Sequence, residues 1–193
     1  PHKNLSRLID AFVLLQKKHP NLKLVLAGKK DVLFLQHEKR VVELGLKDSV
    51  VFTDFVSEGQ LRWLYENCQA YVFPSLSEGF GLPVLEAMAS GTPVITSTVS
   101  SLPEVAGNAA VLVNPHDVDA VYASLVHVLT CRSEHERLRT AGLARAAQFT
   151  WEAMARQTLA VYRQVAEGRK GERGTRGQRD NRSKSKRSED PAP

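Results

Sequence analysis

One stretch of the chain places two carboxylates around a short loop that contains glycine. Glu78 stands directly before Gly79 and Gly81, and Glu86 follows eight residues later. Glycine allows close approach of the backbone, and a helix that begins at Pro83 points its unpaired N–H groups back at the loop, so the loop predicts an anion cradle. Ionised carboxylates only accept hydrogen bonds, and they therefore suit the hydroxyl groups of a hexose or a ribose.

A diphosphate in this loop would accept hydrogen bonds from the amides of Phe80, Gly81 and Leu82 and would meet the positive end of the helix dipole. The alternative is a purely structural turn before a helix, with Glu78 and Glu86 exposed to solvent. Short glycine motifs also occur by chance, so the residues alone leave the two interpretations equally open.

The loop lies where a parallel sheet binds its ligands. Short runs of Val, Leu, Ile and Phe alternate with helical patterns, which is typical of βα units wound into a parallel sheet, and the loop follows the carboxyl end of one such run. The near-continuous apolar content of the runs predicts strands that are covered on both faces. The expected strands are Lys23 to Gly28, Val50 to Phe55, Ala70 to Ser75, Pro93 to Ser97 and Ala109 to Val113.

Apolar residues at helical spacing and capping signals predict the helices between and after these strands. Ser57 has the type of an N-cap, and Gly91 ends the helix that Pro83 begins. The expected helices are Asn4 to Lys18, Leu33 to Leu44, Ser57 to Asn67, Pro83 to Ser90, Asp117 to Thr130, Glu134 to Gln148 and Thr150 to Ala166. The sequence therefore predicts one α/β domain over residues 1–167.

Charge is divided unevenly between this domain and the end of the chain. The protein carries a net charge of +5, and residues 168–193 contain nine Lys or Arg and four Asp or Glu, which leaves residues 1–167 neutral. The end segment has almost no apolar residues and is predicted to be a disordered basic tail. Its charge suits an anionic membrane surface or nucleic acid, with a solvated extension as the alternative. Because no aromatic residue interleaves the charges, no specific nucleic-acid partner is expected.

Other sequence patterns bear on membrane insertion, cellular compartment, metal binding and completeness of the chain. Apolar runs fall far short of the roughly 20 residues that a membrane-spanning helix needs. Cys68 and Cys131 lack the spacing of zinc or redox sites and are expected to be small buried residues in a reducing cytoplasm. No His, Cys or Asp cluster has metal-ligand spacing, so neither a metal nor another cofactor is expected. The start at Pro1 lacks both Met and an apolar signal region, which indicates a fragment.

The carboxylate pair and its surroundings resemble the retaining glycosyltransferases of family 4, which have the two-domain GT-B fold. Glu78 to Glu86 is similar to their E-x7-E motif, and the likeness covers residues 1–166. The further segments that carry it are His2-Lys3-Asn4, Lys23 to Gly28, Val51 to Val56 and Ser101 to Val105. The resemblance implies a Rossmann-like, doubly wound parallel sheet with C-terminal helices, which forms the donor-binding half of a GT-B fold.

The resemblance also implies a role for each site residue. Glu78 would contact hydroxyl groups of the donor sugar, and Lys3 would neutralise the diphosphate, although without the resemblance Lys3 is equally a solvated charge before a helix. The leaving nucleoside diphosphate would be stabilised by fixed amides and cations, without a metal. The donor-binding residues would be Phe80, Gly81 and Leu82 for the phosphates and sugar, Glu86 for the ribose, and Phe55 and Val56 for the nucleobase.

The implied reaction is the transfer of a hexosyl group, with retention, to a glycan or lipid-linked acceptor of polysaccharide biosynthesis. Mannose from a GDP-sugar is preferred, with glucose from a UDP-sugar close behind. A GT-B epimerase or phosphorylase and a non-catalytic nucleotide- or anion-binding module are the alternatives. The expected location is cytoplasmic, with peripheral contact to the inner membrane face through the basic tail.

Two parts of the family pattern are absent from the chain, namely the acceptor-binding N-terminal domain and the first strand of the sheet with its Gly-Arg pair. In the usual strand order that strand is central, so the strands at Lys23 to Gly28 and Ala70 to Ser75 are expected to lose their shared neighbour. The isolated chain is therefore expected to be loosely packed and inactive by itself.

Overall fold

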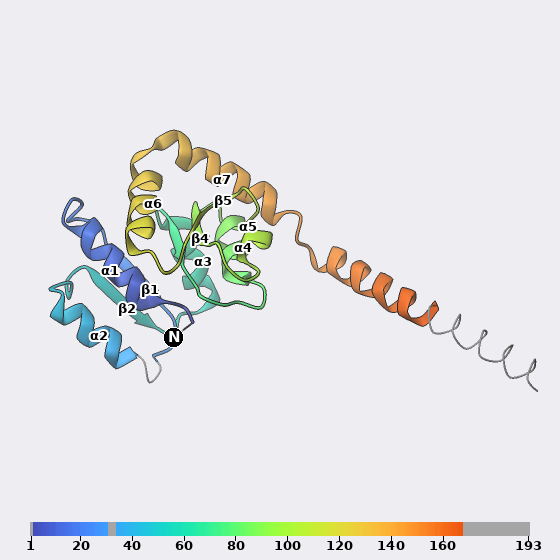
Figure 1. Ribbon diagram of the computed structural model, residues 1–193, viewed down its shortest axis with the longest axis horizontal. Helices are drawn as coiled ribbons and strands as arrows, with labels where there is room; N and C mark the ends of the chain where they lie inside the picture. Colours follow the sequence, from blue (N-terminus) through green and yellow to red (C-terminus); the bar gives the residue numbers. More distant parts are fainter. Residues whose placement is uncertain (1, 31–33, 168–193) are drawn as a thin grey trace, which may run out of the picture. The chain divides into compact units, whose positions relative to one another are not determined.

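The computed structural model describes residues 2–30 and 34–167, in which helices and strands alternate as far as residue 113 and only helices follow (Figure 1). The chain divides into two compact units, Pro1–Gln148 and Phe149–Pro193. A helix at 151–167 lies in the second unit. The elements of the first unit are α1 (Leu5–Gln16), β1 (Leu24–Ala27), α2 (Phe34–Glu43), β2 (Val50–Asp54), α3 (Glu58–Asn67), β3 (Tyr71–Phe73), α4 (Leu82–Ala89), β4 (Val94–Ser97), α5 (Leu102–Ala106), β5 (Ala110–Val113), α6 (Val118–Thr130) and α7 (Arg132–Ala146).

Every predicted strand and helix is present, and the described ends agree with the predicted ones within two residues. Ser57 caps α3, where its side chain accepts from the Gln60 amide. The short helix α5 was not predicted, because five residues are too few for a periodic pattern. The predicted helix start at Leu33 and the predicted disordered tail at 168–193 lie outside the described residues, and the predicted domain boundary at 167 stays a prediction.

All paired strands are parallel, but they form two separate sheets. β1 pairs with β2, and β4 lies between β3 and β5. β1 and β3 do not pair with each other, and each is an edge strand of its own sheet. These are the two strands that were expected to lack a shared neighbour.

The three-stranded sheet is covered on both faces. Ile95 on β4 belongs to a hydrophobic cluster with α1 and α6, whereas the adjacent Val94 belongs to a second cluster with α4 and α5. Successive strand residues point to opposite faces, so the two clusters lie on opposite sides of the sheet. All four residues of β4 are buried. This part of the fold is the doubly wound arrangement that the sequence predicts.

Among the described residues, the two-stranded sheet is covered on one face only. Leu24 and Phe52 pack into the cluster that contains α1. Val25 and Val51 are cross-strand partners that point the other way, and they are 41% and 44% exposed. The prediction that all strands are covered on both faces is therefore wrong for this sheet. An apolar run indicates that both faces of a strand can be buried, but it does not show whether another element packs on each face.

The cysteines also differ from expectation. Cys68 is exposed and Cys131 is half-buried, and both are free. Each lies at the carboxyl end of a helix, Cys68 after α3 and Cys131 after α6, and not in the core. Throughout residues 2–30 and 34–167, no helix is both long and apolar enough to span a bilayer.

Candidate functional site

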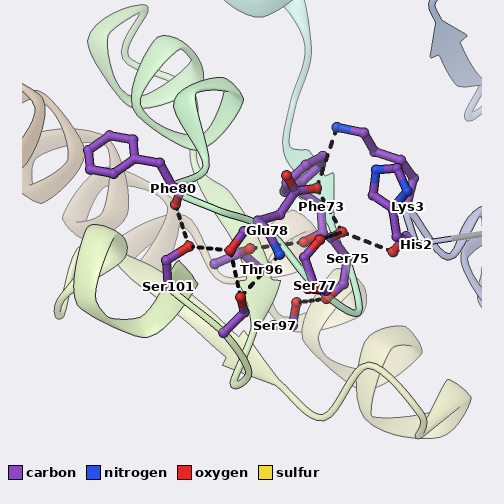
Figure 2. Close-up of polar contacts among 11 residues, drawn as sticks. His2, Lys3, Phe73, Ser75, Ser77, Glu78, Phe80, Thr96, Ser97 and Ser101 are labelled. Carbon is purple, nitrogen blue, oxygen red and sulfur yellow. Dashed lines mark hydrogen bonds and ion pairs between the residues drawn. The ribbon is translucent and has the colours of Figure 1, made fainter.

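The loop between β3 and α4 holds Glu78 in a fixed position (Figure 2). The side chain of Glu78 is only 15% exposed, and its Oε1 lies 2.8 Å from Ser75 Oγ. Lys3 Nζ lies 3.4 Å from the same Oε1. The structure thus brings together the two predicted catalytic residues, although they are 75 positions apart in the sequence. It also removes the alternative in which Glu78 is simply exposed to solvent.

Lys3 is positioned by contacts of its own segment with the end of β3. The carbonyl oxygen of His2 lies 2.9 Å from Ser75 Oγ and accepts a hydrogen bond from the Leu76 amide at 2.7 Å. Lys3 Nζ lies 4.6 Å from the centre of the Phe73 ring, where cation–π attraction adds to the ion pair. Because the Ser75 hydroxyl has one proton, it donates to either the Glu78 carboxylate or the His2 carbonyl at a time.

Asn4 anchors the same segment from inside the fold. Its side chain is buried, and Nδ2 donates to the carbonyl oxygens of Pro74 at 3.0 Å and Pro115 at 2.7 Å. Its φ of 59° lies in the left-handed region, which Asn tolerates better than most residues. The segment before α1 is therefore fastened to the loops after β3 and β5, and Lys3 is held at the site.

Two serines after β4 hold the backbone of the Glu78 loop. Ser100 Oγ donates to the Glu78 carbonyl at 2.6 Å and accepts from the Glu78 amide at 3.1 Å. Ser101 Oγ lies 3.0 Å from the Glu78 carbonyl oxygen and 2.8 Å from that of Phe80. Ser100 has a φ of 61°, an uncommon conformation for a residue other than glycine. The loop is thus fixed at both ends of its glycine-containing part before any ligand arrives.

The amino end of α4 has backbone features that the predicted anion cradle would need. Gly81 caps the helix with a φ of 111°, and a Cβ atom there would lie 2.7 Å from Leu102 Cδ2, so any other residue would strain the backbone and push the Leu102 side chain aside. The amides of Gly81 and Leu82 meet no acceptor among the described residues, and Pro83 has no N–H. By contrast, a Cβ at Gly79 would meet no atom within 4 Å, and the φ of Gly79 is not positive. The fold itself does not require glycine at that position.

Glu86 on α4 is oriented by α3. Tyr65 donates its hydroxyl proton to Glu86 Oε2 at 3.2 Å, and its ring packs edge-on against Tyr71 with 5.2 Å between ring centres. Burial, followed by the negative charge of Glu86, raises the pKa of Tyr65. The hydroxyl therefore keeps its proton at neutral pH and directs the carboxylate through a hydrogen bond.

The predicted nucleobase-binding residues lie in another place, after β2. Phe55 is 78% exposed and follows Asp54, whose φ is 60° and whose Oδ1 accepts from the Lys30 amide at 3.0 Å. That hydrogen bond is the main cause that lowers the pKa of Asp54. Phe55 and Val56 belong to the lining of a pocket of about 300 Å³, with Thr53, Gln60, Trp63 and Leu64. None of residues 78–86 lines this pocket, so the structure does not join the two parts of the predicted site in one cavity.

Sequence reasoning missed the residues that position the site. Ser75, Ser100 and Ser101 lie outside the carboxylate motif. The contacts of Ser100 and Ser101 with the Glu78 loop span more than 20 positions, and the contact of Ser75 with His2 depends on where β3 ends. Asn4 had a signal, because Asn before a helix favours both capping and the left-handed region. In the described part of the chain, no three His, Cys, Asp or Glu side chains group as metal ligands, and the expected independence from cofactors stays a prediction.

Comparisons with known proteins show the family of the chain. The family model "Glycosyl transferases group 1" matches residues 1–145. O-antigen chain mannosyltransferase B of Escherichia coli is 38% identical over 169 residues, which cover 84% of this chain and 43% of that protein. The chain therefore spans less than half the length of this relative.

Solved structures of known glycosyltransferases resemble this chain in fold. Sucrose-phosphate synthase from Thermosynechococcus elongatus has a TM-score of 0.75 and 32% identity, over 85% of this chain and 42% of that one. The C-terminal domain of a group 1 family glycosyl transferase from Francisella tularensis has a TM-score of 0.69 and 25% identity, over 76% of this chain and 79% of that one. The predicted α/β fold, one half of a GT-B arrangement, is confirmed.

Proposed function

This chain belongs to the group 1 glycosyl transferases, and on that basis we propose that it is the donor-binding part of a retaining glycosyltransferase of family 4. The enzyme would transfer a hexosyl group from a nucleoside-diphosphate sugar to an acceptor. The observation that carries the proposal is the fixed loop at the amino end of α4, which combines the ordered Glu78, its partner Lys3 and unpaired backbone donors.

Leaving-group stabilisation is the chemistry that this loop supports. Departure of a nucleoside diphosphate leaves negative charge on its phosphate oxygens, and the amides of Gly81 and Leu82 would meet that charge at the positive end of the α4 dipole. Lys3 would add a full positive charge, and a bound diphosphate would compete with Glu78 for it. Because Ser100 and Ser101 already fix the loop, little reorganisation would accompany the reaction.

The two carboxylates would bind hydroxyl groups at either side of the diphosphate. Glu78 Oε1 is occupied by Ser75 and Lys3, whereas Oε2 meets no donor among the described residues and could accept from a sugar hydroxyl. Glu86 is oriented by Tyr65 and would accept from the ribose hydroxyls. The backbone at Phe55 and Val56 would contact the nucleobase.

We propose GDP-mannose as the donor and a glycan or lipid-linked glycan as the acceptor. The support for mannose is the similarity to a relative that is named an O-antigen chain mannosyltransferase. The acceptor would be bound by a further domain, since the chain covers 43% of that relative.

Calorimetric titration of the purified chain with GDP, UDP and ADP tests the proposal. We expect GDP to bind most tightly and Glu86→Ala to weaken its binding by roughly tenfold or more, because hydrogen bonds to a charged group are lost. Tyr65→Phe is the matched control, since it removes the hydrogen bond to Glu86 and keeps the carboxylate. Its affinity should change much less.

Gly79→Ala adds a steric test in the same assay. The fold leaves the Cβ position at residue 79 open, so the variant should unfold at the same temperature as the parent chain. If the donor passes this backbone closely, the added methyl group should weaken nucleotide-sugar binding. A chain that unfolds cooperatively and binds none of the three nucleotides would refute the donor site.

A further inference from the structure

The hydroxyl group of Ser75 lies between the segment that carries Lys3 and the Glu78 loop (Figure 2). Ser75 is fully buried, and its Oγ lies 2.8 Å from Glu78 Oε1 and 2.9 Å from the His2 carbonyl oxygen. The Ser77 carbonyl oxygen is farther away, at 3.5 Å. All three partners are acceptors, so the hydroxyl acts as a donor that has one proton to give.

Glu78 is the partner that gains most from this proton. The His2 carbonyl oxygen already accepts from the Leu76 amide at 2.7 Å and does not depend on Ser75. A hydrogen bond to a carboxylate is also stronger than one to a neutral carbonyl oxygen. Because the Glu78 side chain is only 15% exposed, water would replace a lost donor poorly. The Ser75 hydroxyl therefore donates mainly to Glu78.

Strand β4 fixes the place from which Ser75 donates. Ser97 is fully buried and donates its hydroxyl proton to the Ser75 carbonyl oxygen. Its neighbour Thr96, also fully buried, donates to the Phe73 carbonyl oxygen at 2.9 Å. A ligand does not compete for hydroxyl groups that are buried in this way. Ser75 Oγ thus keeps its place whether or not the site is occupied.

Lys3, the other partner of Glu78, is held less firmly. Its side chain is 45% exposed, and Nζ lies 3.4 Å from Glu78 Oε1, which is longer than a strong hydrogen bond. A diphosphate would attract this cation away from Glu78, because it carries more negative charge than one carboxylate. Ser75 is uncharged and would stay. In the described part of the chain, no other side chain donates to the Glu78 carboxylate.

We propose that Ser75 is a positioning residue, which holds the Glu78 carboxylate toward the donor sugar while Lys3 turns to the diphosphate. This role rests on the donor site proposed above, in which Glu78 contacts the sugar and Lys3 the diphosphate. Ser75 therefore contributes to the binding of a nucleotide sugar and not to the binding of the bare nucleotide. A hydroxyl group that only stabilises the fold would not separate the two ligands.

Calorimetric titration of the full chain with GDP and GDP-mannose, and with UDP and UDP-glucose, tests this role. The measured quantity is the ratio of the two affinities within each pair. Ser75→Ala should lower the affinity for the nucleotide sugar roughly tenfold, because a hydrogen bond to a charged group is lost, and should change the affinity for the nucleotide less than about twofold. Ser75→Cys keeps the side-chain volume with a weaker donor, so its effect should lie in between. It also carries the test if Ser75→Ala does not fold.

Two controls separate positioning from stability. Thr96→Val removes a fully buried hydroxyl that donates to β3 and does not contact Glu78. It should lower the unfolding temperature about as much as Ser75→Ala and leave the affinity ratios at the parent value. In a Glu78→Ala background, Ser75→Ala should not change the ratios further, because the carboxylate that it positions is absent.

The possible results distinguish this role from the donor site itself. If Ser75→Ala keeps the affinity ratio of the parent chain, or if Thr96→Val changes it equally, Ser75 does not position Glu78, although the donor site would stand. A further change of the ratio in the Glu78→Ala background would also overturn the role. A parent chain that binds none of the four ligands would instead refute the donor site, and the role of Ser75 with it.

Discussion

The two parallel sheets of the first unit have similar strands but different surroundings. β4 is buried along its whole length between one hydrophobic cluster on each face, whereas β1 and β2 leave Val25 and Val51 partly exposed. The loop that carries Glu78 belongs to the covered sheet. The Glu78 carboxylate is therefore held in place in the part of the fold where the sheet has a packed layer on each face.

The loops after the strands show the same contrast. After β3, the chain is held by Ser100, Ser101 and the segment around Asn4, so a ligand would find its partners in place. After β2, Phe55 projects with 78% of its surface exposed. The diphosphate and sugar part of the proposed donor site is thus preorganised, and the nucleobase part is open.

The largest expected difference between the sheets is in core stability. Ile95→Ala should lower the free energy of unfolding by about 2–5 kcal/mol, because it leaves a cavity in a fully buried site. Val25→Ala on the open face should cost about 1 kcal/mol or less. Urea denaturation of both variants measures the difference. Equal losses would break the comparison, and faster amide exchange in β1 than in β4 of the parent chain would support it.

A second contrast concerns two glycines with positive φ, one after a strand of each sheet. Gly81 before α4 has a φ of 111° and a close neighbour in Leu102, whereas Gly28 after β1 has a φ of 147° and open space around an added Cβ. Gly28→Ala should cost about 1–2 kcal/mol of stability from backbone strain alone. Gly81→Ala should cost about 2–4 kcal/mol, because a steric clash adds to the strain. Thermal unfolding of the pair would show no difference if Leu102 moves aside freely.

Most of the fold followed from local patterns. Each strand has an apolar run, and the ends of α3 and α4 have capping residues that the sequence displays, such as Ser57 and Gly91. The open face of β1 and β2 could not be predicted, because burial depends on which elements lie above a sheet. Val25 and Val94 are the same residue type in similar runs, yet only Val94 is fully buried.

Only part of the site could be predicted, because only part of it is formed by residues that are close together in the sequence. Glu78 and Gly81 stand in one short motif, so their neighbourhood is local and visible in the sequence. The meeting of Lys3 with Glu78 came only from the family resemblance, since no local rule links positions 75 residues apart. The contacts of Ser101 with the Glu78 loop were missed, because a serine that binds carbonyl oxygens across two loops has no distinctive spacing.

The smallest expected effect separates positioning from stability. Ser101→Ala removes one hydroxyl that binds the loop, and Ser49→Ala removes the hydroxyl that accepts from Gln16 at 2.8 Å beside β2. Each should cost about 1 kcal/mol of stability, the usual contribution of one hydrogen bond. Only Ser101→Ala should also weaken nucleotide binding, because it loosens the Glu78 loop. Calorimetry on both variants checks this, and equal nucleotide affinities would mean that the loop keeps its conformation without Ser101.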